Sequence, residues 1–146
     1  MSQADKETSD APAPKRAGRI KWVVGGLFLL FAAAAAMNLP RGYSDDLSRT
    51  GKGTAAVVLI RDKNTVQSHE LMNAMDSVRG QFAGKVEFLL TDFDTQQGRA
   101  FIAANNAARA TLVLLDADGN FVKILRAPQT AESMRQEISG SFGVNP

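Results

Sequence analysis

The chain of 146 residues contains no cysteine, and it has one histidine, one tryptophan and one tyrosine. The absence of cysteine excludes disulfide bonds, thiolate catalysis and metal sites that use cysteine ligands. It does not reveal the compartment, because a chain without cysteine is compatible with oxidising and reducing surroundings. The single histidine, His69, has no acidic residue at a spacing that would orient it, and catalysis needs a nucleophile, a base and an orienting group together. These absences favour a binding protein over an enzyme.

A strong excess of charge is also missing, since the net charge is only +2. Residues 1–21 hold five basic and three acidic side chains, and the remainder of the chain holds twelve of each. Nucleic-acid binding requires lysine and arginine clustered on a folded face, so we expect no nucleic-acid partner.

The N-terminal region predicts a single membrane anchor. Residues 1–19 are polar, basic and without aromatic side chains, which predicts a disordered tail. Residues 22–39 are uncharged and reach about 27 Å as a helix, so residues 20–39 are predicted to span a bilayer. Gly25 and Gly26 lie inside this helix and would allow close packing of another membrane helix. The basic residues before it predict a cytoplasmic N-terminus and an exported domain.

Two other interpretations of the apolar stretch compete with the anchor. A cleaved signal peptide would use a small-residue site such as Ala34-Ala35-Ala36, but the leading segment is long and contains three acids. A buried helix of a soluble domain would have to be apolar on every side, which disfavours it.

After a juxtamembrane linker at residues 40–53, rich in glycine, serine and alternating charge, the pattern changes to that of an α/β domain. Residues 55–60 form a continuous apolar run, which predicts a central strand buried on both faces. A helix is expected at 67–81, a strand at 86–90 and a helix at 97–105. Residues 112–115 and 121–125 are expected to form an antiparallel hairpin, because Asp118-Gly119 suits a tight turn with positive φ angles. A last helix begins near Thr130, and residues 143–146 form a tail.

This βαβαββα order over residues 54–142 resembles a minimal thioredoxin-superfamily domain, so the expected fold class is α/β, a thioredoxin-like sandwich preceded by one transmembrane helix. The family's redox site is a Cys-x-x-Cys at the head of the first helix, facing a cis-proline before the third strand. Here Val66-Gln67-Ser68-His69 and Ala110 occupy those places. The peptide bond at Ala110 should be trans, since a non-proline cis bond costs about 3 kcal/mol. The resemblance implies a polypeptide-binding groove that is lined by Val66, Gln67, Ser68, His69, Arg109, Ala110 and Thr111.

Other chemistry is weakly indicated. Asp92 and Asp94 follow a strand, and a cation site there lacks further ligands. The stretch from Asp116 to Asn120 is explained by turn chemistry rather than by calcium binding, because Ala127 stands where a calcium loop has its last glutamate. We expect no metal and no cofactor.

The expected protein is therefore a redox-inactive, membrane-anchored thioredoxin-like binder, an accessory subunit or assembly factor of a bacterial inner-membrane complex, with its domain in the periplasm. The alternatives are a chaperone-like holdase for exported polypeptides and an enzyme that uses Ser68 or His69.

Overall fold

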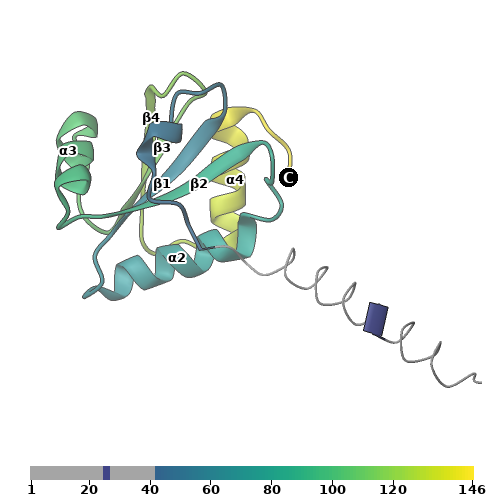
Figure 1. Cartoon of the computed structure of the whole chain (residues 1–146), viewed down its shortest axis with the longest axis horizontal. Helices are drawn as coiled ribbons and strands as arrows, with labels where there is room; N and C mark the ends of the chain where they lie inside the picture. Colours follow the sequence, from purple (N-terminus) through teal and green to yellow (C-terminus); the bar gives the residue numbers. More distant parts are fainter. Residues whose placement is uncertain (1–24, 27–41) are drawn as a thin grey trace, which may run out of the picture. The chain divides into compact units, whose positions relative to one another are not determined.

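The computed structural model describes residues 25–26 and 42–146 (Figure 1). Residues Gly42–Pro146 form one compact unit. Its elements follow the order η1 (Leu47–Arg49), β1 (Ala55–Arg61), α2 (Val66–Val78), β2 (Val86–Asp92), α3 (Gln96–Asn105), β3 (Thr111–Leu115), β4 (Phe121–Arg126) and α4 (Ala131–Phe142). The predicted strands and helices are all present, and their ends lie within three residues of the expected ones. The compact unit begins at Gly42, earlier than the expected domain start at Thr54.

The four strands form one mixed sheet in the order β2-β1-β3-β4. β1 is parallel to β2 and antiparallel to β3, and β3 and β4 form an antiparallel hairpin. The five positions from Ala56 to Ile60 are fully buried, which confirms the expectation that this apolar run forms a central strand. The chain therefore adopts an α/β fold with a four-stranded mixed sheet.

Helices cover both faces of the sheet. Alternate residues of each central strand point to opposite faces, so β1 sends Val57 and Leu59 to one face and Val58 and Ile60 to the other. The first face packs against α2 and α4 through side chains that include Leu71, Met134 and Ile138. The second face packs against α3, whose Phe101 and Ile102 remain partly exposed. Figure 1 shows α3 on one side of the sheet and the pair α2 and α4 on the other.

Residues 42–53, which the sequence assigned to the linker, lie on the domain. The carbonyl of Ser44 accepts a hydrogen bond of 2.9 Å from the amide of Leu90, and this bridge extends the β2 edge. The hydroxyl of Tyr43 donates to Asp76 at 2.7 Å, and Arg49 pairs with Glu87 at 2.7 Å. The segment therefore adds contacts to β2 and α2 before the first strand begins.

The hairpin turn differs from the predicted tight turn. Only Gly119 has a positive φ, +85°, among the residues between the two strands. The carboxylate of Asp116 accepts hydrogen bonds from the amides of Asp118 and Asn120, so the loop is closed by an aspartate side chain across several residues. The register also shifts between Leu114 and Leu115, which leaves one extra residue on β4.

The predicted membrane helix at residues 20–39 lies outside the described residues, apart from Gly25 and Gly26, which are helical and exposed. Among the residues that are described, no helix is long and apolar enough to cross a bilayer.

Candidate functional site

A groove lies between the head of α2 and the loop that precedes β3. Its volume is about 360 Å³, and it is lined by Thr65, Gln67, Ala108, Arg109, Ala110, Thr111, Arg126 and Ala127. Four of the predicted groove residues, Gln67, Arg109, Ala110 and Thr111, are thus brought together. Val66 is adjacent and 70% exposed, the highest exposure among the large apolar side chains in the described part of the chain.

Hydrogen bonds fix the head of α2. Thr65 caps the helix, because its hydroxyl oxygen accepts from the amide of Ser68 at 3.4 Å. Ser68 is 1% exposed, and its hydroxyl oxygen accepts from the amide of Asp62 at 2.8 Å. The side chain of Ser68 is therefore a structural link between the end of β1 and the helix rather than part of the groove wall.

The loop opposite is held in an uncommon conformation. Ala110 has a φ of +56°, in the left-handed region, and its amide donates to the carbonyl of Ile60 at 2.9 Å. The hydroxyl of Thr111 donates to the carbonyl of Ala108 at 2.7 Å. The peptide bond before Ala110 is trans, as expected, and among the described residues the cis bond is the one before Pro128.

Arg109 stands at the wall of this groove. Its guanidinium lies 3.4 Å from the buried carboxylate of Asp62 and 5.7 Å from the ring centre of Phe93. The side chain is nevertheless 64% exposed. Among residues 42–146, neither the amide nor the carbonyl of Arg109 forms a backbone hydrogen bond, so both atoms remain available to a ligand.

His69 lies apart from the groove. It lines a smaller cavity of about 70 Å³ with Arg61, Lys63, Ser68 and Met72, and its Nδ1 is 2.9 Å from the carbonyl of Thr65. Among the described residues no hydrogen bond joins the side chains of Ser68 and His69, because Nδ1 of His69 lies against the carbonyl of Thr65 and the hydroxyl oxygen of Ser68 accepts from Asp62.

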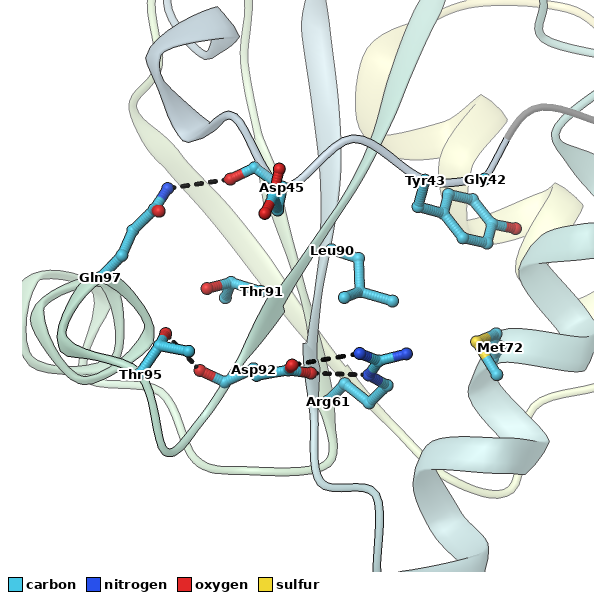
Figure 2. Close-up of a pocket in the computed structure, with 10 residues that line it drawn as sticks. All are labelled: Gly42, Tyr43, Asp45, Arg61, Met72, Leu90, Thr91, Asp92, Thr95 and Gln97. Carbon is cyan, nitrogen blue, oxygen red and sulfur yellow. Dashed lines mark hydrogen bonds and ion pairs between the residues drawn. The ribbon is translucent and has the colours of Figure 1, made fainter.

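The larger cavity, about 520 Å³, lies at the β2 edge between α2 and α3 (Figure 2). Figure 2 shows Arg61 and Asp92 facing each other across the ends of β1 and β2, with Met72 and Tyr43 on one side and Thr95 and Gln97 on the other. Arg61 donates two hydrogen bonds to the carboxylate of Asp92, at 2.6 and 3.1 Å.

The polar groups of this larger cavity are engaged with one another. Lys63 lies 2.8 Å from Asp92, and the hydrogen bonds from Arg61, with the neighbouring Lys63, hold the pKa of Asp92 at about 2. Thr95 donates to the carbonyl of Asp92, and Gln97 donates to the carbonyl of Asp45. Asp92 is thus a structural carboxylate. Among the described residues there is no group of three or more His, Cys, Asp or Glu side chains that could hold a metal ion.

Sequence reasoning missed four of the residues that line the groove, Thr65, Ala108, Arg126 and Ala127. Arg126 is the register partner of Thr111 across the hairpin. Counting outward from Asp118 and Gly119 gives this same pairing, so a register assigned to the predicted hairpin would have placed Arg126 beside the loop.

Comparisons with known proteins add little. No family model matches the chain, and no curated protein matches it. Among solved structures, one described as "Structure of a malarial protein" is 15% identical, covers 60% of this chain and 97% of its own, and has a TM-score of 0.48.

Proposed function

We propose that this protein binds extended polypeptide in the groove between α2 and the loop before β3, and that it carries out no thiol chemistry. The observation that supports the proposal best is that the amide and the carbonyl of Arg109, a residue of the groove wall, form no hydrogen bond with another backbone group among residues 42–146. Extended peptides are commonly held by main-chain hydrogen bonds, with neighbouring pockets for side chains. Val66, exposed at the head of α2 between Thr65 and Gln67 of the groove, supplies an apolar contact.

The proposed family is the thioredoxin superfamily. Support comes from the order of elements: two parallel strands joined by a helix, then an antiparallel hairpin and a closing helix. Because the chain has no cysteine, it would keep the binding groove of this family but lack the dithiol.

The proposed setting is the periplasmic face of a bacterial inner membrane. It rests on the uncharged residues 22–39 and on the basic residues that precede them. In that setting the protein serves as an accessory subunit or assembly factor of a membrane complex, and residues 20–39 hold it in the bilayer.

Two rival functions make different predictions. A holdase binds many exported polypeptides, whereas an assembly factor binds one partner. An enzyme using Ser68 or His69 is disfavoured because the hydroxyl of Ser68 is buried and bonded to the amide of Asp62, and because His69 lines a separate cavity.

The test is photo-crosslinking in native membranes with a photoreactive residue at position 67. Gln67 lines the groove, and Gln81, an exposed glutamine beyond the far end of the same helix, provides a control position about 20 Å away. We expect one discrete adduct from position 67 and none from position 81.

A ladder of many adducts from position 67 would favour the holdase instead. Equal adducts from both positions, or none from position 67, would contradict binding in the groove.

A further inference from the structure

The groove is electropositive. Its lining residues include two arginines, Arg109 and Arg126, and no acid. Both side chains are exposed, and in the described part of the chain no acidic side chain pairs with Arg126. A cation without a partner at the edge of a groove is free to receive an anionic group from a ligand.

The neighbouring acids leave one of the two charges uncompensated. Asp62 pairs with Arg109 at 3.4 Å and offsets part of its charge, while the other oxygen of Asp62 accepts the backbone amide of Asn64 at 3.0 Å. Glu132 is the acid nearest to Arg126 along the chain. Its carboxylate pairs with Arg135 and accepts a hydrogen bond from the side-chain amide of Gln136. Arg126 therefore keeps its full positive charge toward the groove.

We propose that the groove is selective for acidic polypeptide segments, whose Asp or Glu side chains bind the guanidinium groups of Arg109 and Arg126. This inference rests on the proposed polypeptide binding and specifies its partner. A guanidinium group can donate two parallel hydrogen bonds to one carboxylate, so these arginines bind acidic side chains in preference to uncharged ones. The amide and the carbonyl of Arg109 hold the backbone of the segment, and the arginine side chains select its acidic side chains. A segment rich in lysine is repelled by the same two residues.

The experiment uses the full-length chain, labelled with ¹⁵N, in a zwitterionic detergent. Three synthetic peptides of equal length are titrated in turn, in which valine alternates with glutamate, with glutamine or with lysine. We expect the glutamate peptide to shift the amide signals of Gln67, Arg109 and Ala110. We expect its affinity to exceed that of the glutamine peptide by about fivefold, the size expected of an exposed charged pair.

Variants identify the residues that select the charge. Arg126→Gln should weaken binding of the glutamate peptide by about fivefold while leaving the glutamine peptide unchanged. Lys123→Gln, on the same strand but paired with Glu137 of α4, removes the same charge outside the groove and should have no effect. Raising the salt from 0.1 M to 1 M shortens the screening length from about 10 to about 3 Å and should abolish the preference.

The outcomes separate this inference from the proposed function. Equal affinity for all three peptides, with shifts at the same amides, would overturn the acidic preference and leave polypeptide binding in the groove intact. Shifts confined to other parts of the domain, or none with any peptide, would contradict both. Shifts at the groove with vesicles of anionic lipid, but not with the glutamate peptide, would assign the arginines to lipid headgroups and also overturn the inference.

Discussion

At the scale of single residues, Asp92 makes the domain sensitive to acid. The pKa of Asp92 is about 2 in the folded protein, whereas an aspartate without partners, as in the unfolded chain, has a pKa of 3.8. The ion pairs with Arg61 and Lys63 therefore contribute stability above pH 3.8. This contribution is lost as the pH falls from 3.8 toward 2, where the carboxylate becomes protonated. We expect Asp92→Asn to lower the free energy of unfolding by about 1 kcal/mol at neutral pH, since the pair is partly solvated.

Urea unfolding of the wild type and of Asp92→Asn across this pH range measures the effect, and the two curves should converge at the acidic end. Asp94→Asn removes the same charge from an exposed side chain and provides the control. A constant difference between wild type and Asp92→Asn at every pH would contradict the ion-pair explanation.

Gly98, in the first turn of α3, provides a second test at this scale. A Cβ at this position would lie 2.0 Å from the carbonyl oxygen of Asp92, which is backbone and has no room to move. We expect Gly98→Ala to destabilise the domain by at least about 2 kcal/mol, within the range for overpacking. Gly140, in α4, has no atom within 4 Å of such a Cβ.

Gly140→Ala should therefore stabilise the domain by about 0.5–1 kcal/mol through helix propensity alone. Thermal unfolding of both variants gives the comparison. If Gly98→Ala were stabilising as well, the close approach of α3 to the end of β2 would be wrong.

At the scale of elements, the segment before β1 acts as part of the domain. Tyr43 stacks with Arg79, at 4.8 Å from the guanidinium carbon to the ring centre, and donates to Asp76. Burial, followed by this hydrogen bond, raises the pKa of the Tyr43 hydroxyl above its usual value, so Tyr43 stays a donor at physiological pH. The docked ring holds Ser44 against β2.

We expect Tyr43→Ala to release this segment and to speed hydrogen exchange of the Leu90 amide, which donates to Ser44, by about tenfold through local opening. The amide of Val58, in the central strand, should be unaffected. Tyr43→Phe keeps the ring and should produce a smaller change. Unchanged exchange at Leu90 in Tyr43→Ala would show that the bridge does not depend on the ring.

The sequence predicted the elements better than it predicted their connections. Continuous apolar runs identified β1 and β3 because burial on both faces leaves no room for polar side chains. Residues 42–53 have the composition of a linker, because the contacts of this segment are single side chains and a few backbone hydrogen bonds, which leave no periodic pattern. Arg126 was missed because no register was assigned to the hairpin, although the turn at Asp118 and Gly119 implies the observed pairing of Thr111 with Arg126.

At the scale of the whole molecule, the two faces of the sheet are protected unequally. Ile138 of α4 is fully buried beneath α2 and the sheet, whereas Ile102 of α3 is only partly buried on the opposite face. We expect Ile138→Ala to cost about 3 kcal/mol, and Ile102→Ala about 1 kcal/mol, because the cost follows the apolar contacts that are lost.

Urea unfolding of these two variants, which remove the same atoms, tests the difference. Equal losses would mean that α3 contributes as much to global stability as α4 does. The groove depends on both faces, because one wall is the head of α2 and the other is the loop that directly follows α3.

The bridge between Ser44 and Leu89 has one more consequence, which concerns self-association. Strand edges with free backbone groups attract further strands, and a sheet with two open edges can grow without limit into fibres. Within residues 42–146 the β2 edge is occupied at its middle by the chain itself, whereas no strand pairs with the outer edge of β4, where Phe121 and Val122 are exposed. Among the described residues, edge-to-edge pairing of two copies is therefore easier through β4 than through β2, where Ser44 interrupts the edge.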